Sequence, residues 1–255
     1  MLLIEHFMRD INMNGKINSY LTLSAIDGPG LRFVVFLQGC KLRCIYCHNP
    51  DTWLPDNGVV ISAVDIIQLM SKSDEFYRQS GGGLTVSGGE PFYQPEFTAE
   101  IVYNAKKNQY HTAVDTSGCE LLSDYPDIVK NTDLFILDIK ALDNKRYFSI
   151  TGDSIEKSIQ NGIYLSSINK KIWLRYVIIP GYNDTMDEIE AFYNAVNGMK
   201  TVERIQIIPY SKIGIHKWRD AGYISALENV SLTPPEKIRD FIDFINKKAG
   251  KIVAV

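Results

Sequence analysis

Gln38-Gly-Cys-Lys-Leu-Arg-Cys-Ile-Tyr-Cys-His-Asn-Pro50 is the stretch from which the organisation of the whole chain can be worked out. It holds three of the four cysteines, Cys40, Cys44 and Cys47, in the spacing C-x3-C-x2-C. Iron–sulfur clusters select soft thiolate ligands, and a loop with this spacing can wrap around one corner of a cuboidal cluster. Because a four-iron cluster prefers four ligands, three cysteines leave one iron open to a ligand from outside the protein, as catalytic metal sites do.

Two other roles fit these cysteines less well. Structural zinc needs a fourth ligand nearby, but Cys119 lies far along the chain, and His48 is too close to Cys47 to share a tetrahedral site without strain. Three neighbouring cysteines cannot pair evenly as disulfides, and nothing else in the sequence indicates secretion. We therefore expect Cys119 to be a free, packed thiol.

Composition favours one globular domain. The 255 residues are 45% hydrophobic and 22% charged, which is enough to bury a full core as a single domain over residues 1–255. Residues 1–31 are expected to be a lead-in that ends in the turn Asp27-Gly-Pro-Gly30. No apolar run reaches transmembrane length, so we expect a cytoplasmic protein with no membrane partner. A net charge of −3 also predicts no nucleic-acid partner.

Short apolar runs alternate with helical segments along most of the chain. The runs are almost continuously apolar, which predicts strands buried on both faces. Helix starts are predicted at Ser62, Thr185 and Thr233, each followed three residues later by an acidic residue. This alternation predicts an α/β fold with a parallel sheet, in the form of an open, partial (β/α)6 TIM-like barrel, with a further edge strand at 251–255. The predicted strands are Phe33–Leu37, Leu84–Ser87, Thr112–Asp115, Leu134–Ile139, Trp173–Ile179 and Ile205–Ile208.

The C-terminal ends of the strands are where such barrels carry their chemistry. The cysteine loop directly follows the first strand, so the cluster is expected there. Gly89 and Glu90 follow the second strand, where carbonyls and a carboxylate could accept hydrogen bonds from an ammonium group. Asp115 and Asp138 end the next two strands, and would repel each other beside a negative cluster unless a cation or ligand lay between them. The alternative is that each aspartate caps a turn.

Three further polar residues follow or interrupt predicted strands. Lys140 could neutralise one of the aspartates or a ligand carboxylate. Arg175 lies within an apolar run, so its charge must be paired or must face the barrel interior. His216, in the polar and aromatic loop 210–218, fits a surface residue as well as a ligand contact.

Taken together, these motifs resemble the radical S-adenosylmethionine (SAM) enzymes, and among them the pyruvate formate-lyase activating enzymes. The three-cysteine motif is specific to the superfamily, and its combination with His48-Asn49 and His216-Lys217-Trp218 narrows the resemblance to the activating enzymes. The resemblance runs from about residue 27 to the end of the chain. Matching stretches are Asp-Gly-Pro-Gly at 27–30, Gln-Gly-Cys at 38–40, Tyr-Cys-His-Asn at 46–49, Asp-Thr-Trp at 51–53, Ser-Gly-Gly-Glu at 87–90, Asp-Ile-Lys at 138–140 and Arg-Tyr-Val at 175–177.

The resemblance implies an activity. A reduced [4Fe-4S] cluster would cleave SAM, and the resulting 5′-deoxyadenosyl radical would remove an α-hydrogen from a glycine of a glycyl radical enzyme of the pyruvate formate-lyase type. Flavodoxin or ferredoxin would donate the electron. Other activators carry a ferredoxin-like insert, which this chain has no cysteines to build.

The resemblance also implies a set of contacts. Cys40, Cys44 and Cys47 would ligate the cluster, and with Lys140 and His216 they are the residues expected to be catalytic. The remaining residues would contact SAM, a cation or the partner protein. SAM would be contacted by Tyr46, Cys47 and His48 along the adenine, by Gly89 and Glu90 at the methionyl amine, by Asp138, Ile139 and Lys140 at the ribose and carboxylate, and by His216 at the adenosyl end. A monovalent cation would be held by Asp115, Thr116 and Asp138. The partner would be contacted by Asp27 and Arg175.

Two alternatives stay open. A radical SAM enzyme acting on a small molecule would not need the loop at 210–218. An electron-transfer iron–sulfur protein would lack its fourth thiolate ligand here.

Overall fold

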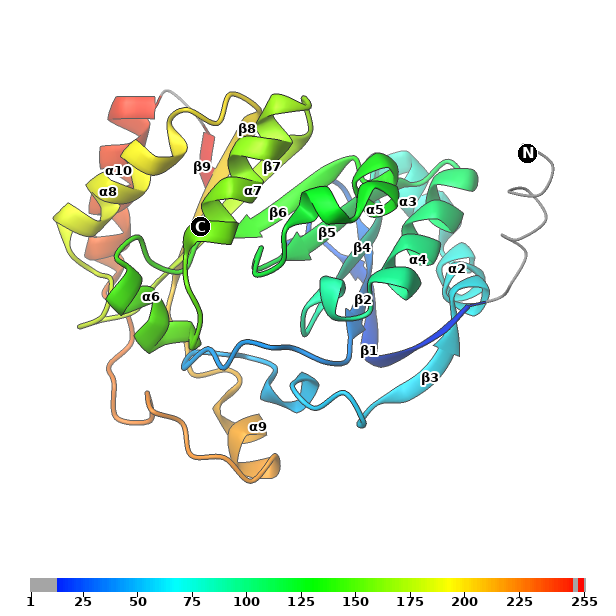
Figure 1. Cartoon of the computed structure of the whole chain (residues 1–255), viewed down its shortest axis with the longest axis horizontal. Helices are drawn as coiled ribbons and strands as arrows, with labels where there is room; N and C mark the ends of the chain where they lie inside the picture. The colour runs from blue at the N-terminus through cyan, green and yellow to red at the C-terminus, as the bar shows by residue number, and fades with distance from the viewer. Residues whose placement is uncertain (1–12, 250–251, 255) are drawn as a thin grey trace.

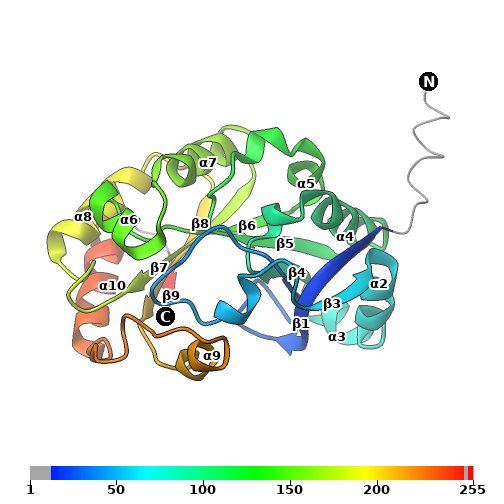
Figure 2. The same ribbon diagram turned by 60° about the horizontal axis from the view of Figure 1, so that its bottom comes forward.

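One sheet organises the protein in this computed structural model, which describes residues 13–249 and 252–254. Its nine strands have the order β3-β1-β2-β4-β5-β6-β7-β8-β9 and form an arc with helices outside it (Figures 1 and 2). The pairings from β2 through β4 to β9 are parallel, whereas β1 is antiparallel to both β2 and β3. The sheet ends at β3 and β9, so the predicted open barrel is confirmed. The strands are β1 Asn14–Ser24, β2 Arg32–Leu37, β3 Val59–Ser62, β4 Gly83–Gly88, β5 His111–Thr116, β6 Leu134–Asp138, β7 Lys171–Ile178, β8 Val202–Pro209 and β9 Ile252–Ala254.

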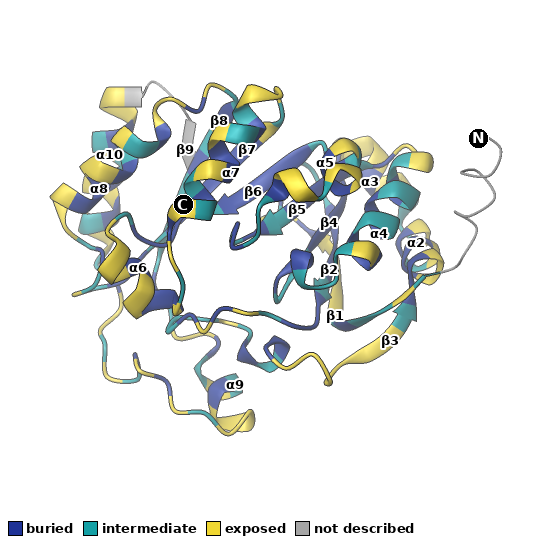
Figure 3. Ribbon diagram, viewed as in Figure 1, coloured by how far each residue is buried: buried dark blue, intermediate teal, exposed yellow. Residues whose placement is uncertain are grey.

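All six predicted strands form, as β2 and β4 to β8, with bounds that differ from the prediction by at most three residues. Most residues of β2, β4, β5 and β6 are buried, as the continuous apolar runs required, because helices cover one face and the barrel interior covers the other (Figure 3). In β7 and β8 buried residues alternate with partly buried ones, such as Arg175 and Gln206, from the middle of each strand onward. β9 confirms the edge strand expected at 251–255.

The lead-in proved more regular than predicted. Asn14–Ser24 forms β1, which pairs along most of its length with β2 and at its start with β3. Because most of β1 and β3 is exposed, neither carries the long apolar run of a strand buried on both faces. Residues 1–12 of the predicted lead-in lie outside the described residues.

Helices begin where their capping residues predict, with one exception. Ser62 Oγ accepts a hydrogen bond from Asp65 N (3.0 Å), and Thr185 Oγ1 accepts one from Glu188 N (3.3 Å). These caps open α2 and α8. The helices are α2 Ala63–Ser71, α3 Asp74–Ser80, α4 Pro95–Lys107, α5 Pro126–Asn131, α6 Asn144–Thr151, α7 Glu156–Ser167, α8 Met186–Val196, α9 Ile215–Asp220 and α10 Pro235–Ala249, with 3-10 turns η1 Pro50–Thr52, η2 Pro91–Tyr93 and η3 Leu122–Asp124.

The exception is the predicted cap at Thr233, which is wrong. α10 begins at Pro235, and Thr233 Oγ1 instead accepts from Tyr210 N (3.0 Å) and donates to the Ile178 carbonyl (2.7 Å). Thr233 therefore joins the ends of β7 and β8. The face of α10 that packs on the protein is apolar, with Ile238, Phe241 and Ile245 buried.

Parallel pairing brings the C-terminal ends of the strands to one end of the barrel. The cysteine loop, residues 38–49, leaves β2 at this end and crosses it (Figure 2). In the part of the chain that the structure describes, no helix is long and apolar enough to cross a membrane.

Candidate active site

The cysteine loop is anchored at its start and at its middle. Gln38 Nε2 donates to the carbonyls of Asp51 (2.8 Å) and Leu54 (2.7 Å), which ties the start of the loop to the segment that follows it. Farther along, the N–H groups of Arg43 and Ile45 each donate to a carbonyl at the end of α6, at 2.9 Å. The loop is thus held across the barrel mouth by bonds that leave its cysteine side chains free.

Four free thiols gather beneath this loop. Leu42, Cys44 and Cys119 form a buried cluster, and Cys40 and Cys47 pack against it. Burial raises the pKa of these thiols, to about 12 for Cys47 and Cys119. A metal that binds the thiolates must therefore displace their protons.

The thiols fit a cluster better than a single ion. Among the described residues, no three His, Cys, Asp or Glu side chains meet closely enough to hold one metal ion. Ligands of three different irons do not need to meet at one point, whereas ligands of a single zinc ion do. The soft donor set of Cys40, Cys44 and Cys47 fits the predicted [4Fe-4S] cluster.

Gly88 and Gly89 let the end of β4 approach the end of β2 and the start of the cysteine loop. A Cβ at Gly88 would lie 2.2 Å from Leu37 N, and one at Gly89 would lie 2.2 Å from the carbonyl oxygen of Gly39. Glu90 N donates to that same carbonyl at 2.9 Å. The backbone at Gly88 and Gly89 therefore packs directly against the end of β2 and the start of the cysteine loop.

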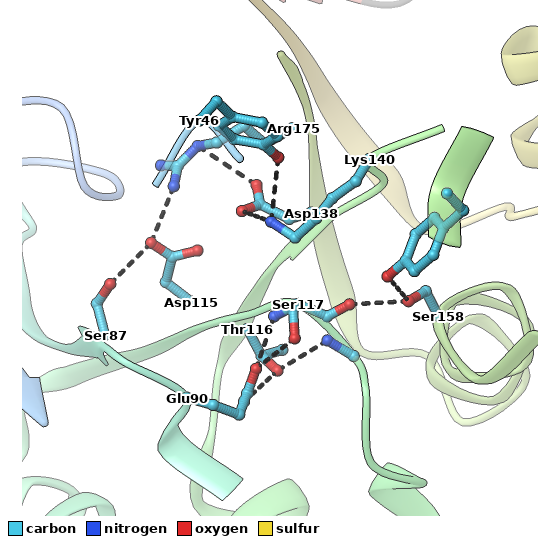
Figure 4. Close-up of polar contacts among 12 residues, drawn as sticks. Tyr46, Ser87, Glu90, Asp115, Thr116, Ser117, Asp138, Lys140, Ser158 and Arg175 are labelled. Carbon is cyan, nitrogen blue, oxygen red and sulfur yellow. Dashed lines mark hydrogen bonds and ion pairs between the residues drawn. The ribbon is translucent and has the colours of Figure 1, made fainter. Parts of the chain in front are cut away.

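Glu90 ties two loops together (Figure 4). Its buried carboxylate accepts from Thr116 Oγ1 (2.6 Å) and from Phe92 N (3.3 Å) at one oxygen. At the other oxygen it accepts from Ser117 N (3.0 Å) and Ser117 Oγ (2.5 Å). Burial raises the pKa of Glu90, and the hydrogen bonds from Ser117 and Thr116 oppose that rise. A ligand ammonium group would have to compete with these donors for Glu90.

Two ion pairs at the ends of β5, β6 and β7 lie side by side in the mouth (Figure 4). Arg175 Nη1 of β7 is 2.9 Å from Asp115 Oδ2 of β5, which also accepts from Ser87 Oγ (3.0 Å). Lys140 Nζ is 3.1 Å from Asp138 Oδ2 and 3.2 Å from the Tyr46 hydroxyl. The repulsion predicted between Asp115 and Asp138 is thus offset within the chain.

The two cations of this network stay charged at neutral pH. Burial alone would lower the pKa of Arg175, but the carboxylates of Asp115 and Asp138 hold that pKa above its usual value. Burial would likewise lower the pKa of Lys140, and Asp138 and Tyr46 outweigh it. Burial raises the pKa of Asp115, and the guanidinium of Arg175 opposes this.

One contact in the network is incomplete. Arg175 Nε and Asp138 Oδ1 lie 4.0 Å apart, and both atoms are buried without a hydrogen-bond partner among the described residues. A buried polar atom left unsatisfied costs about 1–3 kcal/mol. This donor and acceptor therefore mark a place where a bound polar group would complete the site.

Comparison with known proteins identifies the family. A family model described as a 4Fe-4S single cluster domain matches residues 26–156. The pyruvate formate-lyase-activating enzyme of Staphylococcus aureus strain USA300 is 36% identical over 247 residues, covering 94% of this chain and 98% of that relative. This chain belongs to the pyruvate formate-lyase-activating enzyme family.

Solved structures share the fold of this activating enzyme. A domain of a pyruvate-formate lyase-activating enzyme from Bacteroides vulgatus superposes with a TM-score of 0.57 at 19% identity, covering 68% of this chain and 98% of that one. Streptococcus suis SuiB, crystallised with its precursor peptide SuiA, superposes with a TM-score of 0.67 at 16% identity, covering 87% and 47%. At these identities the likeness is one of fold.

Most of the predicted site residues of the activating enzyme come together at the barrel mouth. The three cysteines, Tyr46, Glu90 and the residues of the two ion pairs lie there, as described above. Asp27 is close enough for its charge to act on both Arg175 and Arg32, and its carbonyl accepts from Thr85 Oγ1 (2.7 Å). His216 is exposed on α9, whose neighbouring residues contact the cysteine loop.

Asn183 is a site residue that the sequence pattern did not reveal. It is fully buried, and its Nδ2 donates to the carbonyls of Lys140 (3.0 Å) and Val177 (2.8 Å). It thereby fixes the backbone of Lys140. The available signal was weak, because an asparagine after Pro180 and Gly181 is typical of any turn.

A hollow lies at the other end of the barrel, where the parallel strands begin. It has a volume of about 740 Å³, and its lining includes His111 and Lys171, which begin β5 and β7. It contains no cysteine and lies away from the strand ends that carry the chemistry in such barrels. We therefore place the active site at the cysteine loop.

Proposed function

We propose that this activating enzyme generates a glycyl radical on a partner of the pyruvate formate-lyase type, with a [4Fe-4S] cluster and SAM as cofactors. One observation carries the proposal: three thiols of the cysteine loop lie at the mouth of an open barrel together with the two buried ion pairs, in which Arg175 Nε and Asp138 Oδ1 lack hydrogen-bond partners in the described part of the chain. The near full-length similarity to a named activating enzyme supports the same function.

The residues of the chain act by holding and orienting. When bound, the cluster and SAM supply an adenosyl-based radical by one-electron reduction of the sulfonium, and this radical removes a hydrogen atom from a glycine Cα. Lys140 offers a buried ammonium group to a ligand carboxylate, while Asp138 and Arg175 offer the unpaired acceptor and donor. Radical chemistry requires no general acid or base in this scheme, so position and exclusion of water are what the protein contributes.

A monovalent cation near Asp115, Thr116 and Asp138 is part of the proposal. Arg175 now neutralises Asp115, and Thr116 Oγ1 donates to Glu90, so a cation would have to displace these contacts. Two acids beside a bound carboxylate and a negative cluster are the feature that favours it. SAM affinity that does not respond to sodium or potassium would refute this part.

We further propose that the partner's glycine loop reaches the mouth through the open side of the barrel, against Asp27 and Arg175. SuiB, which shares the fold, was crystallised with a bound peptide, and this supports the idea that such a barrel can hold an extended chain. Flavodoxin or ferredoxin is the proposed electron donor. The free cysteines favour a reducing compartment, for which we propose the cytoplasm.

Release of 5′-deoxyadenosine tests this function against its rivals. Cluster-loaded, reduced protein should release 5′-deoxyadenosine from SAM faster when a pyruvate formate-lyase type partner is present. The same partner with its radical-bearing glycine changed to alanine is the control, and should give less hydrogen-atom transfer. Rapid release with a small molecule and none with the partner would instead support an enzyme of small-molecule substrates, and no release at all would support an electron carrier.

A further inference from the structure

The loop after β8 folds back onto the cysteine loop. We call residues 210–220, which include α9, the strap. In Figures 1 and 2 α9 lies beside η1, the turn that directly follows the cysteine loop. The described contacts join the strap to the loop from its last cysteine onward.

Two strap side chains carry these contacts. Trp218 Nε1 donates to the carbonyl of Cys47 at 2.9 Å. Lys217 Nζ donates to Asn49 Oδ1 at 2.8 Å and lies 3.3 Å from Asp51 Oδ2. They therefore hold the carbonyl of the third cluster cysteine and the residues after it.

Packing closes the remaining space between the two segments. The Trp218 ring meets Trp53 edge to face, with 5.0 Å between centroids. Gly214 lies so close to the backbone of His48 that a Cβ there would be 2.5 Å from the His48 carbonyl oxygen. The gap between strap and loop has a volume of only about 10 Å³, which is room for at most about one water.

We infer that Lys217 and Trp218 are positioning residues. They hold residues 47–49 of the cysteine loop against the strap, so that the two segments move together. The inference rests on the proposed function and on the contact with SAM that the family resemblance predicts for His216 of the same short helix. One helix carries both the hydrogen bond to the Cys47 carbonyl and the predicted contact with SAM. Packing of the strap against the cysteine loop and binding of SAM therefore favour each other. Neither residue touches the reacting atoms in this scheme.

Loaded protein provides the first test. Lys217→Met and Trp218→Phe should each weaken SAM binding about fivefold, which corresponds to one net hydrogen bond of about 1 kcal/mol. Both variants should retain the iron content of the parent, because the three cysteines are unchanged, and both should show a smaller change in the cluster's paramagnetic resonance spectrum on adding SAM. Lys217→Arg, which keeps the positive charge, should bind SAM with the affinity of the parent. Arg219→Met, which removes a strap cation that pairs with Glu228, is the matched control.

Apo protein provides a second test that needs neither cluster nor SAM. The chain has three tryptophans, and Trp173→Phe leaves only Trp53 and Trp218, which both lie at the strap. In that background, Lys217→Met should make the tryptophan fluorescence more accessible to acrylamide quenching, and Arg219→Met should not.

Two results would overturn the inference. One is unchanged SAM affinity and quenching in the Lys217 and Trp218 variants, and the other is an equal loss in Arg219→Met. If the parent protein fails to bind SAM, the proposed function is wrong. In that case the quenching experiment still decides whether Lys217 holds the strap.

Discussion

At the scale of single residues, Glu90 has a structural role in the loops of the site. Its carboxylate accepts four hydrogen bonds that join the loops after β4 and β5, while its predicted contact with the methionyl amine of SAM stays a prediction. Such a residue should affect stability even in protein that holds no cofactor.

Glu90→Gln should therefore destabilise the apo protein by about 1–3 kcal/mol, since one of the two oxygens that accept from Thr116 and Ser117 becomes an amide donor. Urea unfolding of apo protein measures this directly. The exposed Glu96→Gln is the control, and an equal effect of the two substitutions would show that the hydrogen bonds of Glu90 add nothing.

His111 provides a prediction of pH dependence. Burial, together with the nearby Arg32, lowers the pKa of His111 from 6.5 to about 4, and Arg32 Nη1 lies 3.2 Å from its Nδ1. As pH falls from 6.5 toward 4 the unfolded chain takes up a proton that the folded protein excludes, so stability is lost in this range. The unfolding free energy of His111→Gln should fall less steeply over the same range. Parallel curves for parent and variant would contradict the assignment.

At the scale of elements, the apolar pattern of the sequence predicted the buried strands but did not reveal the exposed strands β1 and β3. The runs that became β2 and β4 to β6 stand out because both faces are covered, whereas β1 has the mixed pattern of an exposed antiparallel strand. Thr233 has the sequence of a helix cap, but tertiary contacts with Tyr210 and Ile178 use its hydroxyl. Local pattern cannot reveal a competitor that is distant in sequence.

The site shows the same limit. Spacing predicted Cys40, Cys44 and Cys47 as cluster ligands, since ligands that are close in sequence leave a local pattern; that assignment stays a prediction. The pairing of Arg175 with Asp115 joins two strands far apart in sequence, and the contact of Trp218 with Cys47 joins residues 171 positions apart. Only the fold brings these together.

The cysteine loop as an element makes a prediction about Cys119. Cys119 packs beside the loop cysteines but belongs to the segment after β5, and the spacing assigns it no iron. Anaerobic reconstitution should give about four irons and four sulfides per chain in both the parent and Cys119→Ala. Loss of the cluster in Cys119→Ala, or about eight irons per chain in the parent, would contradict the assignment of a single cluster.

At the scale of the whole molecule, an open barrel explains how one chain can hold a small cofactor and act on a large partner. The sheet ends at β3 and β9 instead of closing, while the strand ends carry the thiols and charges. A single domain over residues 1–255 stays a prediction, and the continuous sheet from β3 to β9 is consistent with it.

The central claim is that this activating enzyme places a radical on a glycine of its partner. Electron paramagnetic resonance of the reduced, cluster-loaded protein mixed anaerobically with SAM and a pyruvate formate-lyase type partner tests it most directly. We predict a glycyl radical signal, split by the remaining α-hydrogen, that disappears with Cys44→Ala in the activating enzyme or with alanine at the partner's glycine. Release of 5′-deoxyadenosine with no radical on the partner would contradict the claim.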